Sequence, residues 1–301
     1  MIEEIKHIRY VYHYTSLETL FAILENYRKS KDKKGLVFRA SNIFKVNDPT
    51  EMERGYDVIK KYLHKYERDN SIPETMRLSE VYHDEENEKS CKDDYLSGIK
   101  ANTITIGMVP YVLSFSAKRD YLPMWSLYGN KGRGVCLKFD LNNLICPNNT
   151  QIGFVAYNKT YYRSFVENIK YLYDLYQSSC KSDEKIISMQ KKISELSFIC
   201  FAMSPYFKYK DYQYEKEFRL VYTKNYGQDF SKITIDSIKT FPKKHEVDPF
   251  VEIPIPACSL AEVIMGPCMD ENVMRNVIKN EILSCNLKMK VSKSNIPFRL
   301  K

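Results

Sequence analysis

Several motifs that identify common protein classes are missing from this 301-residue chain. Its eight cysteines lie at least ten residues apart, so it has neither a Cys-x-x-Cys redox motif nor a paired-cysteine zinc motif. Histidine is scarce, with five residues, and neither Gly-x-Gly-x-x-Gly nor Gly-x-x-x-x-Gly-Lys-Ser/Thr occurs. These absences argue against a thioredoxin-like protein, a P-loop nucleotidase and a dinucleotide dehydrogenase, and they predict no metal site.

Long apolar runs are also missing. The densest one, residues 198–203, is far shorter than the ~18 residues that cross a bilayer. The N-terminus, MIEEIKHIRYVYHY, has scattered charges in place of the basic and then apolar regions of a secretory signal. Isolated cysteines in an unsecreted chain are usually small buried hydrophobes in a reducing compartment. We therefore expect a cytoplasmic protein with no membrane partner.

Tyrosine and positive charge are what the chain has in excess. It contains 24 Tyr against a single Trp, and 46 Lys and Arg against 38 Asp and Glu, a net charge of +8. A basic, Tyr-rich chain favours an anionic partner with flat rings, such as a nucleotide or a nucleic acid. A core and surface that simply use tyrosine often would give the same composition.

Strand and helix patterns mix along the chain without strict alternation. Predicted strands cover residues 9–13, 36–40, 111–116, 134–140, 152–157, 217–223, 232–236, 251–255, 261–265 and 289–292. Predicted helices start at 16 and 49, pass through 125–128, and span 161–177, 184–203 and 270–283. This pattern predicts an α+β fold with mixed, mostly antiparallel sheets and flanking helices. We expect a single domain over residues 1–301, and the pattern leaves the oligomeric state open.

Local signals place two helix starts. Thr15 and Glu18 have the spacing of a capping box. Asp48 and Glu51 flank a Pro-Thr pair that is typical of a first helical turn, although the two acids could also serve as a general acid and base. The apolar stripe that follows, over residues 52–66, predicts core packing.

Residues 67–100 differ from their surroundings. The stretch HDEENEKSCKDD concentrates acids and has no apolar periodicity. This composition predicts a flexible, acidic insertion or lid.

The turn from Tyr12 to Ser16 combines a histidine with hydroxyl groups. A histidine at the end of a strand can place its ring in a cleft, and the peptide groups that follow can bind a planar amide. A hydrogen-bonded core histidine would fit the same pattern. His13, Tyr14 and Thr15 are therefore candidate ligand-binding residues, with core packing as the alternative.

The segment from Ser114 to Tyr128 is the densest in polar and aromatic groups. Ser114 and Ser116 share one face of the predicted strand because side chains alternate along a strand. Hydroxyls followed by Arg119 suit hydrogen bonds to a ribose and contact with a phosphate. Trp125 and Tyr128 could stack on a ligand or pack in the core.

Glu215, Glu217 and Arg219 share one face of a later predicted strand. Two carboxylates and an arginine are costly to bury unless they pair, so a salt-bridge ladder at a sheet edge is one interpretation. A glutamate held there can also bind a sugar hydroxyl and stabilise a developing oxocarbenium cation.

The order of these motifs resembles a bacterial family of domains of unknown function. The motifs are YHYTS, NDPTE, SFS, PMWSLYG and EKEFR, and the resemblance runs from Tyr12 to the final SKSNIPFR. That family name brings no activity with it.

A more remote resemblance does imply an activity. YHYTSLETLFAIL is similar to the opening motif of DarT-type DNA ADP-ribosyltransferases, and RDYLPMW resembles their Arg-then-Pro-Met stretch. A His, then a Ser-containing strand, then a Glu is also the order in the wider ADP-ribosyltransferase superfamily. The resemblance implies an ADP-ribosyltransferase-like fold and NAD as substrate.

The same resemblance implies roles for the first two motifs. His13 would hydrogen-bond a ribose of NAD. The peptide groups of Tyr14, at the turn that Thr15 begins, would hold the nicotinamide amide. Ser114 and Ser116 would brace the cleft.

It also implies roles for the later residues. Arg119 would contact the pyrophosphate or the acceptor. Glu217, or Glu215 if the register is shifted, would bind the hydroxyl of the nicotinamide ribose; we prefer Glu217 because it lies further into the strand, where packing fixes a side chain better. The tyrosine that stacks on the ligand stays open among Tyr111, Tyr121 and Tyr128.

The sequence thus predicts an ADP-ribosyltransferase-like enzyme that binds NAD and transfers ADP-ribose to an acceptor. The net charge favours DNA or RNA as that acceptor, and such an activity would suit a toxin or a phage-defence effector. The alternative, from another class, is a non-catalytic module that binds a nucleotide or a nucleic acid through its basic, Tyr-rich surface.

Overall fold

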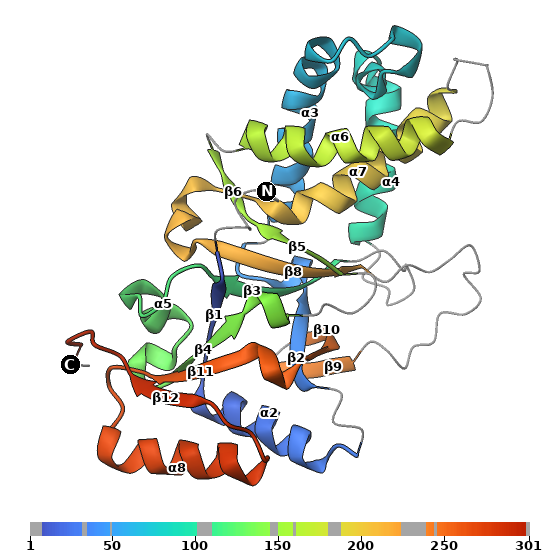
Figure 1. The fold of residues 1–301 in the computed structure, drawn as a ribbon. Helices are drawn as coiled ribbons and strands as arrows, with labels where there is room; N and C mark the ends of the chain where they lie inside the picture. The colour runs from blue at the N-terminus through green and yellow to red at the C-terminus, as the bar shows by residue number, and fades with distance from the viewer. Residues whose placement is uncertain are drawn as a thin grey trace.

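The computed structural model describes residues 8–31, 35–48, 50–100, 110–144, 150–158, 161–179, 188–223, 239–243 and 246–298. A large sheet has helices against both of its faces (Figure 1). The helices are α2 (Leu17–Lys29), α3 (Glu51–Asp69), α4 (Glu85–Lys100), α5 (Leu122–Leu127), α6 (Tyr161–Ser179), α7 (Met189–Met203) and α8 (Glu271–Ser284). The strands are β1 (Tyr10–Thr15), β2 (Leu36–Asn42), β3 (Pro110–Ser116), β4 (Val135–Asp140), β5 (Thr150–Phe154), β6 (Ala156–Tyr157), β7 (Phe207–Lys208), β8 (Glu217–Thr223), β9 (Lys239–Lys243), β10 (Glu246–Ile255), β11 (Leu260–Met265) and β12 (Lys290–Lys293).

Ten of the described strands form one sheet. Its main order is β12–β11–β4–β1–β3–β2–β10–β9, and β8 and β5 continue the sheet from β3. The β11–β12 pair is parallel, whereas the other pairs in this sheet are antiparallel. The predicted α+β fold with a mixed, mostly antiparallel sheet is therefore confirmed.

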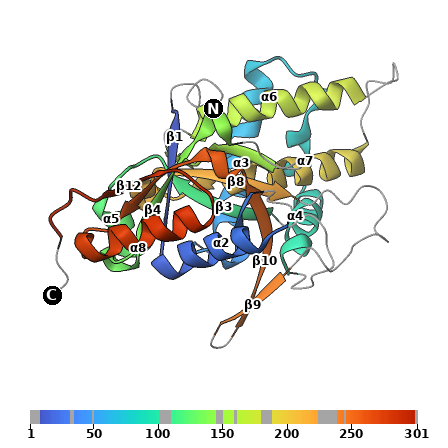
Figure 2. The same cartoon turned by 60° about the horizontal axis from the view of Figure 1, so that its bottom comes forward.

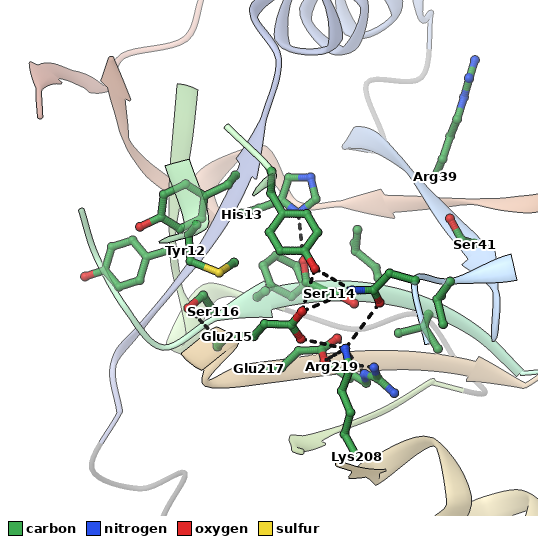
Figure 3. A pocket seen from close by; sticks show the side chains of 18 residues that line it. Tyr12, His13, Arg39, Ser41, Ser114, Ser116, Lys208, Glu215, Glu217 and Arg219 are labelled. Carbon is green, nitrogen blue, oxygen red and sulfur yellow. Dashed lines mark hydrogen bonds and ion pairs between the residues drawn. The ribbon is translucent and has the colours of Figure 1, made fainter. Parts of the chain in front are cut away.

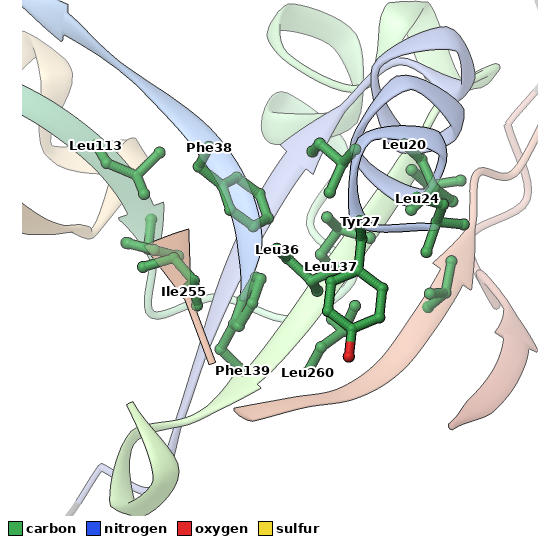
Figure 4. Packing of buried hydrophobic residues seen from close by; sticks show 14 of the residues in the cluster. Leu20, Leu24, Tyr27, Leu36, Phe38, Leu113, Leu137, Phe139, Ile255 and Leu260 are labelled. Atoms are coloured by element: carbon green, nitrogen blue, oxygen red, sulfur yellow. The ribbon is translucent and has the colours of Figure 1, made fainter. Parts of the chain in front are cut away.

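Helices α2 and α8 lie side by side against one face of the sheet (Figure 2). Leu20 and Leu24, one turn apart on α2, are fully buried and point toward the strands. They belong to a cluster that includes Leu36 of β2 together with Leu137 and Phe139 of β4 (Figure 4). This is the first hydrophobic core.

The second core lies on the opposite face of the sheet, beneath α3, α4, α6 and α7. The stripe expected over residues 52–66 packs there, and the side chains of Ile59 and Leu63 are fully buried. Val112 of β3 and Val221 of β8 join the cluster from the sheet. Helices α3, α4, α6 and α7 therefore cover only part of the second face of the sheet, and the polar side chains described below lie on the remainder of that face.

Helix α2 begins one residue later than the capping-box pattern predicts. Ser16 is the N-cap, and its hydroxyl accepts a hydrogen bond from the Thr19 amide at 3.2 Å. Thr15 is the last residue of β1, where it pairs with Val135. Both hydroxyl residues can cap a helix, so the sequence pattern could not separate them.

Residues 67–100 contain regular helices, where the sequence pattern predicts none. A 3₁₀ helix spans Leu78–His83, and α4 follows. Val81 and Cys91 are buried in the second core, and α4 packs against α7. The buried carboxylate of Glu67 accepts hydrogen bonds from the amides of Leu78 and Ser79 at 2.8 and 3.1 Å. Because few apolar residues anchor this segment, its pattern was too sparse to predict helices.

Two predicted elements fall partly or wholly outside the described residues. They are the strand at 232–236 and the first residues of the helix at 184–203. Among the helices that the structure describes, none is long and apolar enough to cross a membrane.

Candidate functional site

Strands β1 and β2 diverge next to the middle of β3. Strand β8 pairs with β3 along one edge, from Pro110 to Ser116. The other edge is shared, because β1 pairs with it at Ser116 and β2 pairs with it at Tyr111 and Val112. Within the described ladders, the stretch around Ser114 therefore has no strand partner on this edge.

His13 lies where these two strands diverge. Its Nδ1 is 2.9 Å from the carbonyl oxygen of Ser114, which can only accept, so Nδ1 carries the proton and donates. The imidazole packs edge-on against Phe38 and Phe115, with ring centroids 5.5 and 5.8 Å away. Burial lowers the pKa of His13 below its usual value, so the ring is neutral at pH 7. A side chain thus binds the carbonyl that a strand would otherwise bind.

The pKa of His13 makes stability depend on pH. Because burial lowers this pKa, the unfolded chain takes up the proton more readily, and the free energy of unfolding falls as the pH drops below about 6.5. His13→Asn keeps a donor near Nδ1 but does not titrate. When urea unfolding is measured at pH 7.5 and 5.5, we expect the free energy of unfolding to fall less between the two pH values in this variant than in the wild type. An identical loss in both proteins would show that His13 does not titrate as the structure indicates.

The register of the strands brings polar side chains together on one face of the sheet. Tyr12, Ser116 and Glu217 lie opposite one another on β1, β3 and β8. Ser114 and Arg219 lie opposite each other two residues away. Since side chains alternate along a strand, all five project from the same face, as the sequence pattern predicts for the two serines.

A cavity of ≈ 240 Å³ lies where β1 and β2 part (Figure 3). His13 also lines it, although the strand register places its side chain on the opposite face, where it packs against Phe38 and Phe115 of the first core. From the sheet the cavity is lined by Tyr12, His13, Tyr14, Arg39, Ser41, Val112, Leu113, Ser114, Phe115, Ser116, Glu217 and Arg219. Residues from outside the large sheet complete it: Val46, Asn47, Met124, Tyr128, Lys208 and Glu215. Four separate parts of the sequence therefore meet around one space.

Arg219 is the centre of a buried ion cluster on the cavity floor. Its Nε and Nη2 donate to Glu217 at 2.7 and 2.9 Å, and its Nη1 and Nη2 donate to Glu51 at 2.6 and 2.8 Å. Nη1 also donates to the carbonyl of Pro205. The side chains of Arg219 and Glu51 are each 1% exposed. The planar guanidinium fork suits this pairing with two carboxylates.

Lys208 is the second cation of the cluster. Its Nζ lies 2.7 Å from Glu215 and 3.3 Å from both Glu217 and Glu51. Burial alone would lower the pKa of Lys208, but the surrounding carboxylates outweigh it and raise this pKa. Burial alone would raise the pKa of Glu217, but Arg219 and Lys208 outweigh it and lower this pKa to about 2. Both Lys208 and Glu217 are thus charged at neutral pH.

Glu215 reaches the cluster from just before β8. It ends a 3₁₀ helix, and Lys216 after it adopts a left-handed conformation with φ 44°. The Glu215 carboxylate accepts hydrogen bonds from the hydroxyl of Tyr128 at 2.6 Å and from the amide of Asn47 at 3.3 Å. Its backbone carbonyl accepts from the hydroxyl of Ser116 at 2.6 Å. Glu215 is therefore fixed from three sides.

Seven of the nine residues predicted for the site line the cavity: His13, Tyr14, Ser114, Ser116, Tyr128, Glu215 and Glu217. Thr15 and Arg119 are not among the lining residues. Arg119 forms an ion pair with Glu262 at 3.0 Å instead. Tyr128 lines the cavity whereas Tyr111 and Tyr121 do not, which separates the three candidates for a stacking tyrosine.

Sequence reasoning missed three partners of this cluster. The pattern around Glu51 predicts a helix start, and this residue does open α3, but its carboxylate also binds Arg219. Lys208 carried no motif. Asn47 stood in a motif but had no assigned role, although its amide donates to the Tyr128 hydroxyl at 2.7 Å.

Across the described part of the chain, no group of three or more His, Cys, Asp or Glu is arranged to hold a metal ion.

Together, the fold and site define an α+β protein with a polar cavity where two strands of one sheet part. A family model described as "Protein of unknown function (DUF2971)" matches residues 124–220, which include most of α5 and the acids before and on β8. This match supports the resemblance to a family of domains of unknown function. No curated protein and no solved structure matches the chain.

Proposed function

We propose that the protein is an ADP-ribosyltransferase-like enzyme that binds NAD in this cavity and transfers ADP-ribose to an acceptor. The observation that carries the proposal is the convergence of His13, Ser114, Ser116, Glu215 and Glu217 around one space. These residues come from three distant parts of the sequence, and polar groups with perturbed pKa values that meet in a cavity are typical of functional sites.

The charge of the cluster suits the bond that would break. Loss of nicotinamide cleaves the bond between the ribose C1′ and the pyridinium nitrogen, and the departing ring keeps the electron pair. Positive charge then develops on the sugar, and an acceptor nucleophile attacks C1′ and gives up its proton. Glu217, ionised because its pKa is held near 2, would stabilise that charge and bind a ribose hydroxyl. Ser114 and Ser116 offer further hydroxyls beside it.

The size of the cavity limits which part of NAD it can enclose. Ligand pockets usually measure ~300–1,000 Å³, and this one measures ≈ 240 Å³. It therefore suits the nicotinamide and its ribose, with the remainder of the dinucleotide outside. The net charge of +8 favours a nucleic acid as the acceptor.

One observation favours a second candidate, a non-catalytic module that binds a nucleotide or a nucleic acid. The carboxylates of Glu215 and Glu217 are both engaged by Lys208, and Glu217 is also bound by Arg219. Such pairing would suit a structural cluster beneath a binding surface. This module would bind DNA or RNA in a salt-dependent way and would release no nicotinamide.

Isothermal titration with NAD and an assay for released nicotinamide test the proposal on the wild-type chain. We expect saturable binding of NAD, a rise in the unfolding temperature with NAD concentration, and nicotinamide release that increases when DNA or RNA is added. Binding of nucleic acid without any release of nicotinamide would favour the binding module. The absence of both NAD binding and release would contradict the proposal.

A further inference from the structure

The cavity has two chemically different ends. The closed end is the ion cluster of Glu51, Glu215, Glu217, Lys208 and Arg219 on its floor. The open end is formed by β2, where Arg39 and Ser41 line the cavity and are solvent-exposed. Figure 3 shows these two β2 residues apart from the cluster, with Arg39 extending away from the floor. A ligand with differently charged halves would therefore meet different partners at the two ends.

The closed end disfavours a phosphate. Three carboxylates there face two cations. Burial raises the pKa of Glu51, so the cluster has at most one negative charge in excess. Lys208 lies within 3.3 Å of all three carboxylates, and Arg219 binds two of them. Neither cation is available for a further anion. This end suits the positively charged nicotinamide ring and its ribose.

The open end presents a cation for an anionic group. The guanidinium of Arg39 lies over the ring of Phe250, 4.7 Å from its centroid, so the side chain is supported on one side. Arg39 pairs across the ladder with Glu252, and Glu252 also forms an ion pair with Lys239 at 2.7 Å. The Ser41 hydroxyl projects from the same face of β2.

The strand register puts this cation within reach of the rest of the dinucleotide. Ser41 pairs with Val112 in an antiparallel ladder, so Arg39 comes level with Ser114, where the strands part. Ser114 in turn pairs with Arg219 on β8. At the level of Ser41, Val112 and Val221 the backbones of β2 and β8 are separated by two strand spacings, about 10 Å, and beyond this level β2 leaves β3 toward Arg39. A pyrophosphate attached to a ribose on the cavity floor can span that separation.

Arg119, the cation expected from the sequence to contact the pyrophosphate, lies elsewhere. It does not line the cavity, and its guanidinium is bound to the buried carboxylate of Glu262. Lys138 and Lys290 also lie near Glu262, at 3.7 and 3.6 Å. Arg119 is therefore part of a separate charge cluster that includes β4 and β11.

We infer that the open end of the cavity is a phosphate-binding subsite in which Arg39, with the Ser41 hydroxyl beside it, contacts the pyrophosphate of the dinucleotide. This inference rests on the proposed function. It assigns opposite ends of the ligand to opposite ends of the cavity: the cationic ring to the acidic floor, and the anionic bridge to β2. Arg39 is a binding residue in this account and takes no part in bond cleavage.

The test compares ligands with and without the pyrophosphate. Binding of NAD, ADP-ribose, nicotinamide riboside and inorganic pyrophosphate is measured on the wild type, Arg39→Gln, Arg119→Gln and Arg68→Gln. Arg68 is an exposed arginine of α3 that does not line the cavity, and it serves as the matched control. We expect Arg39→Gln to weaken the binding of NAD and ADP-ribose about 10- to 100-fold and to leave nicotinamide riboside unchanged. The other two variants should bind all four ligands as the wild type does.

The outcomes separate this inference from the proposed function. If NAD binds and Arg39→Gln binds it as tightly as the wild type, or if Arg119→Gln weakens it instead, the subsite is wrong and the proposed function stands. If the wild type binds pyrophosphate in an Arg39-dependent way but binds neither NAD nor nicotinamide riboside, the subsite stands and the proposed function fails. If the wild type binds none of the four ligands, both are wrong. Unfolding curves of Arg39→Gln that match the wild type show that the loss is local.

Discussion

Replacing Glu217 with glutamine is expected to lower nicotinamide release from NAD by at least about 100-fold at saturating NAD. The amide keeps the size of the side chain but removes the charge that faces the developing cation, and the loss of one such electrostatic partner typically costs ~10²–10³-fold in rate. Glu217 is fixed by two hydrogen bonds from Arg219, so no neighbouring carboxylate can move into its place without breaking the cluster. The measurement is the rate of release per mole of folded protein.

Two further variants control this prediction. Glu25→Gln removes an exposed carboxylate that pairs with Lys29 on α2, remote from the cavity, and should leave release unchanged. Glu215→Gln removes the acid that Tyr128 and Asn47 hold. If Glu215→Gln loses release while Glu217→Gln keeps it, the preference for Glu217 is wrong. If both glutamine variants release nicotinamide at the wild-type rate, neither carboxylate acts on the reaction.

Replacing Arg219 with alanine is expected to lower the free energy of unfolding by about 3–5 kcal/mol. The guanidinium is 1% exposed and neutralises two buried carboxylates, those of Glu217 and Glu51. Its removal leaves Lys208 as the nearest cation for three buried acids. Urea unfolding at pH 7 measures the effect, which should shrink in acid, where the carboxylates become protonated.

An exposed ion pair provides the comparison. Arg163 pairs with Glu167 one turn along α6 and is 60% exposed, so Arg163→Ala should cost less than about 0.5 kcal/mol. An Arg219→Ala variant as stable as Arg163→Ala would mean that water reaches the cluster, contrary to the burial described here. The triple variant Arg219→Met, Glu217→Gln, Glu51→Gln should regain stability over Arg219→Ala, because it no longer leaves buried charges unpaired.

The sequence predicts those elements of this fold that have a strong local signal. The stripe from Met52 to Tyr66 gives α3, and alternation places Ser114 and Ser116 on one face of β3. The helices in 67–100 were not predicted, because their burial depends on contacts such as that between Cys91 and Ser197. Those contacts join residues that lie far apart in the chain and leave no periodic pattern.

The same reason limits what the sequence shows of the site. Glu217 and Arg219 are two residues apart, so their common face could be predicted. Glu51 binds Arg219 from a position 168 residues earlier, and it satisfies the rules for a first helical turn at the same time. Lys208 belongs to no sequence motif, and its role can be seen only in the fold, where three carboxylates surround its ammonium group. Arg119 stands beside the Ser114 motif in sequence, yet it pairs away from the cavity.

A structure of the protein with carba-NAD, in which a carbon replaces the ring oxygen of the nicotinamide ribose, tests the central claim most directly. We expect the nicotinamide ribose to lie in the cavity where β1 and β2 diverge, with one of its hydroxyls in hydrogen-bond contact with the Glu217 or Glu215 carboxylate. Carba-NAD bound away from His13, Ser114 and these two acids would contradict the claim that this cavity is the site of ADP-ribose transfer.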